Sequence, residues 1–252
     1  MTTNPSRPQR LYLMQVATMT IGPLTLPVPC YLIQTADGKN ILIDSGLPRN
    51  MPGSERTEDV KEDSLGRRLI IKYGKDVIEQ LTTIGVRPAD IDLFVCTHYD
   101  DDHAGNIGAF PNARLIAQRL QHEVAGAGHP RFALTRSQWD QPASRYQLVD
   151  GDTELLPGLE LIETSGHVPG HQAVLVHLPQ TGPVLLAIDA VAVQAHFTAD
   201  RPVAPTDADG AGAIASTRKL LELVERKHIS LVIFGHDGPQ WATLKQLPDF
   251  FD

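Results

Sequence analysis

The sequence predicts an α+β protein in which two β-sheets pack face to face and helices cover their outer sides, a four-layer αββα sandwich. Two observations favour this fold class. Along the 252 residues, a strand-rich stretch, a helix and a further strand follow one another twice, so two similar halves are expected. Polar stretches rich in His and Asp directly follow apolar strands, as expected of a rigid scaffold that gathers side chains from distant positions. We expect residues 1–252 to form a single domain.

The first half is expected to begin with strands. Alternating apolar residues predict strands within 10–19 and 30–46, and the second of these breaks at Asp37-Gly38, a dipeptide typical of a hairpin. Residues 51–66 are polar and are interpreted as a loop. The later elements are a helix that ends at Gly85, strands over 91–98 and 113–118, a helix over 119–127 and an irregular stretch over 126–147.

The second half repeats this alternation. Short apolar runs predict strands over 146–151, 159–166, 172–179, 183–190 and 229–238. A helix is predicted over 212–227, because Leu220, Leu221 and Val224 fall on one face and charged residues on the other. Composition alone supports only an α/β or α+β protein, so the sharper prediction depends on the motifs that follow these strands.

Composition excludes several classes of function. Lys and Arg number 22 against 30 for Asp and Glu, so the formal net charge is −8 and a general binder of nucleic acid is not expected. No window of about 18 apolar residues predicts a membrane span, and no apolar stretch of a signal peptide follows the N-terminal arginines. Cys30 and Cys96 lie in apolar runs and are interpreted as buried thiols in a reducing cytoplasm. Any metal is therefore expected on His and carboxylate side chains.

The densest group of candidate metal ligands lies in residues 97–106. His98, Asp100, Asp102 and His103 fall close together there. In an extended segment the side chains at 98, 100 and 102 point to one side, and His103 joins them if the chain turns into a helix. Clustered aspartates repel one another unless a cation neutralises them. A metal site is therefore the functional interpretation, and an acidic surface loop or helix cap is the alternative.

Three further polar stretches follow apolar strands. His167 and His171 flank a loop that contains Gly and Pro, Asp189 ends one strand, and His236 ends the last strand. Each of these residues taken alone is more often structural than functional. Together they place potential ligands at several strand ends, which predicts one shared site.

With these motifs the chain resembles the metallo-β-lactamase superfamily, and within it the N-acyl-homoserine lactonases. The resemblance covers nearly the whole chain and is carried, in order, by LPVPCYLI, ILIDSGLP, THYDDDHAGN, LIAQRLQHE, TSGHVPGHQ, LLAIDA and FGHD. It implies two divalent metal ions, most simply zinc. By the same resemblance, the first ion is held by His98, Asp100 and His167, the second by Asp102, His103 and His236, with Asp189 bridging both. His171 is implied to support the His167 loop without being a ligand.

Two residues depart from the family pattern. Asp100 stands where the family usually has His, which tilts the metal preference from zinc towards iron, manganese or cobalt. The alternative is that Asp100 only caps the loop and the first metal binds weakly. The similar di-iron oxygen reductases need a flavin-bearing domain, for which this chain has no room. Ala192 stands where the lactonases have a tyrosine that donates to the developing oxyanion, and Tyr99 or His196 is a candidate substitute donor.

The resemblance implies a hydrolase that opens a lactone or ester with a metal-bridging hydroxide, with N-acyl-homoserine lactone (quorum quenching) as the most specific substrate. Asp102 is the candidate for carrying the proton to the leaving alkoxide. Residues 51–66 and 126–142 are expected to cover the site, and Phe132 and Trp139 to line an acyl-chain groove.

Several other functions remain open. They are a carboxylesterase, a glyoxalase II-like thioesterase, a phosphodiesterase, a β-lactam hydrolase and a non-enzymatic binding protein on the same scaffold. The net charge of −8 argues against the phosphodiesterase, and the absence of a basic patch argues against an anionic glutathione thioester. The small-molecule substrate is the only expected partner besides a second copy of the chain, since a homodimer is an open alternative to a monomer.

Overall fold

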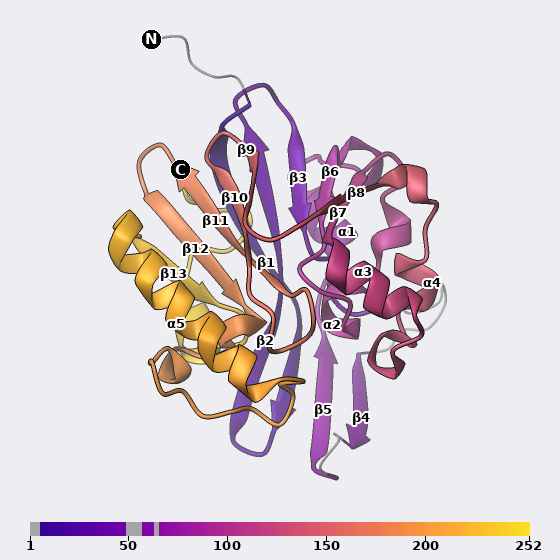
Figure 1. Ribbon diagram of the computed structural model, residues 1–252. Helices are drawn as coiled ribbons and strands as arrows, with labels where there is room; N and C mark the ends of the chain where they lie inside the picture. Colours follow the sequence, from indigo (N-terminus) through magenta and orange to yellow (C-terminus); the bar gives the residue numbers. More distant parts are fainter. Residues whose placement is uncertain (1–5, 49–56, 63–65) are drawn as a thin grey trace.

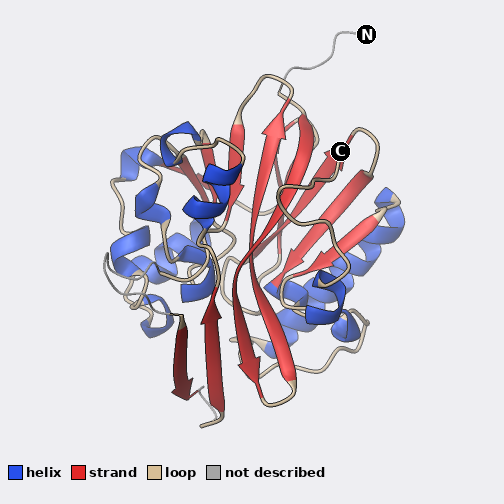
Figure 2. Ribbon diagram, turned by 180° about the vertical axis from the view of Figure 1, so that it is seen from behind, coloured by secondary structure: helices blue, strands red, loops and turns tan. Residues whose placement is uncertain are grey.

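The computed structural model describes residues 6–48, 57–62 and 66–252. Two β-sheets lie face to face in the middle of the molecule, and helices lie on the outer side of each sheet (Figure 1). Figure 2 shows the same four layers from behind, with the helices on both flanks and the strands between them. The predicted α+β sandwich is confirmed.

The first sheet has eight strands in the order β4-β5-β1-β2-β3-β6-β7-β8. Their bounds are β1 (Pro8–Ile21), β2 (Leu24–Thr35), β3 (Asn40–Ile43), β4 (Glu58–Glu62), β5 (Arg68–Tyr73), β6 (Leu93–Val95), β7 (Arg114–Gln118) and β8 (Tyr146–Val149). The long strands β1 and β2 pair antiparallel, with Leu13 opposite Tyr31. Strands β3, β6, β7 and β8 pair in parallel, so their carboxyl ends meet at one edge.

The second sheet has five strands in the order β13-β12-β11-β10-β9. Their bounds are β9 (Thr153–Leu156), β10 (Leu159–Glu163), β11 (Gln172–Leu178), β12 (Gly182–Ile188) and β13 (Leu231–Phe234). Strands β9 to β12 are antiparallel neighbours, whereas β12 and β13 run parallel. The residues that follow β12 and β13 therefore emerge on the same side.

The helices are mostly short. The α-helices are α1 (Val77–Thr83), α2 (Asp101–Ala104), α3 (Arg119–Gly126), α4 (Arg136–Trp139), α5 (Gly210–Lys227) and α6 (Gly238–Trp241). The 3-10 helices are η1 (Pro88–Asp90), η2 (Ile107–Ala109), η3 (Pro130–Phe132), η4 (Ala143–Arg145), η5 (Asp189–Val191) and η6 (Gln194–His196). Asp76 caps α1 and Asp209 caps α5 by accepting from backbone N–H groups of the first turn. No helix of the described ranges is both long and apolar enough to cross a membrane.

Three apolar cores separate the four layers. Side chains of β1 alternate between two of them, so Leu11 and Leu13 face the second sheet while Tyr12 and Met14 face the helices. The third core lies between the second sheet and α5, where Leu220 packs among buried residues of that sheet. Cys30 and Cys96 are buried free thiols, as predicted.

The main correction concerns the polar stretch before α1. The structure shows that residues 58–62 form the edge strand β4, which pairs antiparallel with β5. The remainder of the predicted 51–66 loop, apart from 57 and 66, lies outside the described residues. The 58–62 segment consists mainly of charged residues and has no apolar face. Its strand conformation comes from backbone pairing with β5, which periodicity cannot reveal.

Candidate metal centre

The candidate ligands gather where loops leave the two sheets. His98 follows β6, and Asp102 and His103 lie in α2. His167 lies in the loop between β10 and β11. Asp189 and His236 follow the parallel neighbours β12 and β13. The residues that the sequence predicts as ligands therefore meet in one place, although they come from separate parts of the chain.

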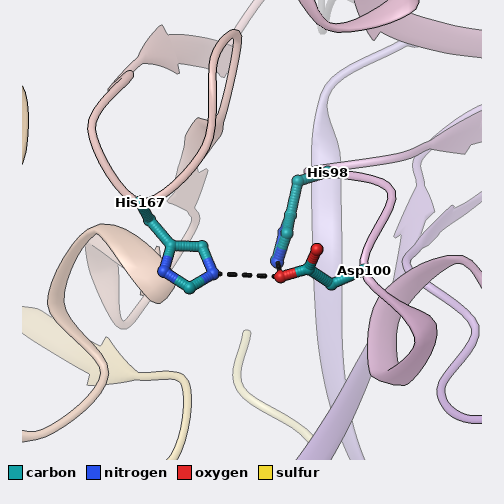
Figure 3. Close-up of side chains that lie close together, drawn as sticks. All are labelled: His98, Asp100 and His167. Atoms are coloured by element: carbon teal, nitrogen blue, oxygen red, sulfur yellow. Dashed lines mark hydrogen bonds and ion pairs between the residues drawn. The ribbon is translucent and has the colours of Figure 1, made fainter. Parts of the chain in front are cut away.

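The first group consists of His98, Asp100 and His167, which we call the first triad. The Oδ2 atom of Asp100 lies 3.5 Å from Nε2 of His98 and 3.2 Å from Nε2 of His167. Figure 3 shows both rings pointing towards this carboxylate. The three candidate ligand atoms all lie within 4.8 Å of one another, a spacing that one metal ion can span.

The second group consists of Asp102, His103 and His236, which we call the second triad. The Oδ2 atom of Asp102 lies 3.6 Å from Nε2 of His103 and 3.7 Å from Nε2 of His236. Asp189 lies between the groups. Its Oδ1 atom is 3.4 Å from Nε2 of His103 and 3.0 Å from Nε2 of His236, and its Oδ2 atom is 3.4 Å from Nε2 of His167.

The four candidate histidine ligands are oriented through their Nδ1 atoms. These atoms contact Thr97 Oγ1 at 3.1 Å for His98, Asp44 Oδ2 at 2.8 Å for His103, the Pro27 carbonyl at 2.7 Å for His236, and Asp207 Oδ1 at 3.7 Å for His167. An acceptor beside Nδ1 favours the tautomer that carries hydrogen there, which leaves the lone pair of Nε2 facing the site. Such outer partners are typical of histidines that bind metals.

His171 lies beside the two triads without being part of either. Its Nε2 atom accepts a hydrogen bond from the backbone N–H of Asp189 at 3.3 Å, and its Nδ1 atom contacts Thr164 Oγ1 at 2.8 Å. Both ring nitrogens are therefore engaged. Burial and the neighbouring His98 and His167 rings hold the pKa of His171 well below its usual range, which favours a neutral, positioning ring.

The donor set fits a divalent metal ion. Nε2 of His98 and Nε2 of His103 are buried and have no hydrogen-bond partner among the described residues, a costly state for polar atoms unless something else binds them. Imidazole nitrogen and carboxylate oxygen suit zinc, iron, manganese and cobalt. Neither triad contains a thiolate, which agrees with the expectation that His and Asp hold any metal.

Neighbouring charged groups control the ionisation of Asp189 and His167. Burial opposes ionisation of Asp189, but His236 and His103 hold its pKa well below the usual range. Burial likewise lowers the pKa of His167, but hydrogen bonds to Asp100 and Asp207 raise it overall to about 9. The carboxylates thus attract positive charge to this pocket, as a cation site requires.

Arg131 joins the first triad, although no sequence pattern predicts this contact. It lies in η3, and its Nε and Nη2 atoms donate to Oδ1 and Oδ2 of Asp100 at 2.7 and 2.5 Å. Although burial opposes ionisation, this guanidinium and the His167 ring hold the pKa of Asp100 well below its usual range. Arg131 lies in an irregular stretch without periodicity, so no sequence signal indicated the contact.

Asp207 and Arg201, which the sequence did not predict either, orient His167 from the Nδ1 side of its ring. Asp207 forms a buried ion pair with Arg201, whose Nη1 atom also donates to the carbonyl of Ala190 at 2.6 Å. The backbone N–H of Ala204 donates to the same carboxylate at 2.7 Å. These contacts hold Asp207 beside Nδ1 of His167, so the loop after η6 is part of the support of the first triad.

A cavity of about 460 Å³ opens onto both triads. Its apolar lining residues include Met19, Ile21, Leu26, Leu69 and Leu134. Ala192 and His196 also line it, so the predicted substitute donor His196 lies at the cavity. An amphipathic small molecule with a hydrolysable group would fit this combination of apolar and polar lining residues.

The other three predicted substrate contacts require correction. Tyr99, Phe132 and Trp139 are buried in the core between the first sheet and its helices, and none of them lines this cavity. Tyr99 stacks on Trp139 with ring centroids 5.4 Å apart, and its hydroxyl contacts Nδ1 of His122 at 3.0 Å. These rings pack the core of that layer, and Arg131 and Leu134 are the members of the 126–142 stretch that line the cavity.

Comparisons with known proteins agree with this geometry. The family model of the metallo-beta-lactamase superfamily matches residues 24–236. An N-acyl homoserine lactonase of Bacillus sp is 34% identical over 237 residues, which cover 93% of this chain and 91% of that protein. The N-acyl homoserine lactonase AttM of Rhizobium radiobacter is 32% identical, with 90% and 88% covered.

Solved structures of N-acyl homoserine lactone hydrolases are also similar to this chain. An N-acyl homoserine lactone hydrolase with the product N-hexanoyl-L-homoserine at its catalytic metal centre has a TM-score of 0.83 and 28% identity, and 97% of this chain and 100% of that chain are covered. A mutant of AiiA from B. thuringiensis, with N-decanoyl-L-homoserine bound at the active site, has the same TM-score, identity and coverage. The chain therefore belongs to the metallo-β-lactamase superfamily.

Proposed function

We propose that this chain is a metal-dependent lactonase that opens the ring of N-acyl homoserine lactones. The observation that carries the proposal is that two candidate metal-ligand triads meet at Asp189 and open onto a cavity whose lining includes several apolar side chains. A relative that is 34% identical over 93% of this chain and bears the name N-acyl homoserine lactonase supports the same substrate class. Quorum quenching would be the biological consequence.

The ligand roles follow from the geometry of the two triads. His98, Asp100 and His167 would hold one ion, Asp102, His103 and His236 the other, and Asp189 would contact both. When bound, such ions polarise a carbonyl oxygen and lower the pKa of a coordinated water. Zinc is the first candidate, with iron, manganese or cobalt as alternatives because Asp100 adds a hard, anionic donor.

Asp102 is the proposed proton carrier. Its carboxylate lines the cavity and faces His103 and His236. As water attacks the lactone carbonyl carbon, Asp102 accepts the proton that the water loses. When the bond between that carbon and the ring oxygen breaks, Asp102 returns the proton to the ring oxygen. The products are a carboxylic acid and an alcohol on one molecule, so atoms and charge balance.

The cavity wall suits the acyl chain of the substrate. Leu26, Leu69 and Leu134 offer apolar surface on which an alkyl chain loses contact with water. His196 is the proposed donor to the developing oxyanion or to the amide, because it lines the cavity close to Ala192 in the chain. Esters of similar shape are the second candidate substrates, because Ala192 lacks the hydroxyl that the lactonase pattern places there.

A substrate panel tests the proposal. N-hexanoyl homoserine lactone, an aryl ester, a glutathione thioester, a phosphodiester and a β-lactam are each incubated with the metal-loaded protein, and products are identified by mass spectrometry. We expect ring opening of the lactone, and its loss in His98→Ala and Asp189→Ala. The matched control His177→Ala removes a histidine that pairs with Glu160 outside both triads and should remain active.

Other outcomes of the panel decide against the proposal. Turnover of the thioester, phosphodiester or β-lactam without lactone opening would move the function to another hydrolase of the same fold. Metal binding without turnover of any substrate would favour a binding protein. Cytoplasmic location stays a prediction from the sequence, and a homodimer stays an open alternative to a monomer.

A further inference from the structure

The contact between Arg131 and the first triad uses the same atoms that a metal ion would need. The Nη2 atom of Arg131 lies 2.5 Å from Oδ2 of Asp100 and 2.9 Å from Nε2 of His167. A metal ion binds an imidazole through the single lone pair of one ring nitrogen, and the positively charged guanidinium lies in front of that nitrogen, where the ion would have to sit. A guanidinium does not lose its proton in proteins. Arg131 in this position and a metal ion in the first triad therefore exclude each other.

Arg131 is held in this position by the fold. Its Nη1 atom donates to the carbonyl of Thr206 at 2.6 Å, beside the Asp207 that supports His167. The side chain is 25% exposed and that of Asp100 is 14% exposed, so the pair is shielded from water but reaches the cavity. The guanidinium also meets the carboxylate as a fork, the geometry of a strong arginine–carboxylate pair.

Asp100 makes this contact possible. A carboxylate accepts two parallel N–H donors from one guanidinium, whereas an imidazole offers at most one acceptor. Arg131 thus pairs directly with the carboxylate that stands where the family usually has histidine. The presence of Asp100 and of Arg131 is explained if the two residues function as an ion pair.

Among the residues that the structure describes, no such cation pairs with the second triad. In the described ranges, no Lys or Arg nitrogen forms a salt bridge with Asp102 or Asp189, and their ion pairs are with histidine rings alone. Nε2 of His103 also has no hydrogen-bond partner there. The two triads therefore differ in one respect, which is the presence of an internal cation in the first.

We infer that Arg131 is a gate on the first triad, so that metal ions bind this chain in a fixed order. The second triad and Asp189 take an ion directly and tightly. The first triad takes one only when Arg131 leaves Asp100 and His167, so its affinity is lower. In the form with one metal ion, Arg131 keeps a positive charge at the first triad. The inference rests on the metal centre of the proposed function and adds the order of filling.

Metal titration without substrate tests this inference. The metal-free chain is titrated with Co²⁺ or Zn²⁺ by calorimetry, and retained metal per chain is measured by mass spectrometry after gel filtration. For the wild type we expect one tightly retained ion and a second that binds at least about tenfold more weakly. In Arg131→Ala the two affinities should approach each other by about tenfold or more, with two ions retained.

The control variants separate gating from folding. Arg136→Ala removes an exposed arginine of the neighbouring helix, paired with Asp140, and should leave the titration unchanged. Arg131→Gln removes the charge while keeping an amide donor for Thr206, so it should match Arg131→Ala if the gate is electrostatic. Circular dichroism of each metal-free variant checks that it is folded.

The opposite results would overturn the inference. Equal affinity for two ions in the wild type, or loss of the second ion in both Arg131 variants, would mean that Arg131 supports Asp100 as a ligand. Because no substrate is present, these readings are independent of lactone opening. Ordered metal binding without lactone opening would reject only the proposed function, and lactone opening with equal, unordered binding would reject only the gate.

Discussion

His103 illustrates how a single side chain decides which atoms of the centre are free to bind a cation. Its Nδ1 atom contacts Oδ2 of Asp44 at 2.8 Å, and Asp44 is itself fixed by the backbone N–H and hydroxyl of Thr97 at 2.8 and 2.7 Å. The ring is therefore held with Nε2 towards Asp102 and Asp189. Asp44 therefore orients the His103 ring without itself being a candidate ligand, and a substitution at Asp44 can test this role.

Asp44→Asn is expected to lower the metal affinity of the second triad by about 10- to 100-fold. The amide of Asn can place N–H groups against Nδ1 of His103, which favours the tautomer that carries hydrogen on Nε2 and blocks that ligand atom. Competition with a chromophoric chelator measures the affinity. Asp92→Asn is the control, because Asp92 accepts from the Asn40 backbone at the opposite end of β3. Unchanged affinity in Asp44→Asn would contradict the orienting role.

Ala192 is the second residue that can be tested alone. It lines the cavity near Asp189, where the lactonase pattern has a tyrosine. Ala192→Tyr should raise kcat for homoserine lactones, up to the order of 10²-fold if the hydroxyl reaches the developing oxyanion. Ala192→Phe supplies the same ring without the hydroxyl and should give no gain. Equal rates for the two variants would show that the hydroxyl has no role at this position.

Residue patterns also explain one wrong expectation. Tyr99 stands between His98 and Asp100, and in an extended segment neighbouring side chains point to opposite sides. The alternation that placed 98 and 100 together thus directs Tyr99 into the core, where it stacks on Trp139. The expected extended conformation does not continue to 102, because Asp102 lies in helix α2. Arg131 and Asp207, in contrast, could not be found from the sequence. They lie in irregular stretches, and only the tertiary fold brings them to Asp100 and His167.

At the scale of elements, the loop that carries His167 depends on its contact with α5. The backbone N–H groups of Ala208 and Asp209 donate to the carbonyls of His167 and Gly166, both at 2.9 Å. Gly166 has a φ of +143°, and a Cβ atom there would lie 2.2 Å from the backbone nitrogen of Ala213. The close approach of loop and helix therefore requires glycine.

Gly166→Ala is expected to destabilise the protein by about 1–3 kcal/mol or more, because the loop must move away from α5. His167 would move with it, so metal binding to the first triad should weaken more than binding to the second. Urea unfolding and metal titration measure the two effects. Gly126→Ala in α3, where a Cβ atom would have no neighbour within 4 Å, should be neutral or stabilising. Equal effects of the two substitutions would contradict this view.

Elements with strong apolar patterns were predictable, and elements held by pairing alone were not. Strands β6, β12 and β13 appear in the sequence as short apolar runs, and the polar residues that follow them include His98, Asp189 and His236. Strand β4 has mainly charged residues, and its position at the sheet edge comes from pairing with β5. Backbone hydrogen bonding between segments leaves no periodic trace in such a sequence.

At the scale of the whole molecule, the metal centre lies where loops from both sheets meet. Buried or half-buried carboxylates gather there, namely those of Asp44, Asp100, Asp102, Asp189 and Asp207. Their mutual repulsion opposes folding, and bound cations would relieve it. The stability of the entire fold should therefore depend on metal.

Metal binding should raise the melting temperature of the chain. An ion at about 100 times its Kd adds about 2.7 kcal/mol, which corresponds to roughly 5–10 °C for a domain of this size. Differential scanning calorimetry of chelator-treated and zinc-loaded protein measures the change. Asp189→Ala should show a much smaller rise, because that residue faces both triads. Equal melting temperatures with and without metal would mean that neither triad binds an ion.

One rate measurement decides whether the two triads together open a lactone ring. N-hexanoyl homoserine lactone is mixed with metal-free protein and with the same protein reloaded with zinc, manganese, iron or cobalt, and the ring-opened acid is followed by mass spectrometry. We expect no turnover without metal and rapid formation of the acid after reloading with at least one of these ions. Ring opening that is independent of metal, or absent with every ion, would mean that the triads do not form the catalytic centre of a lactonase.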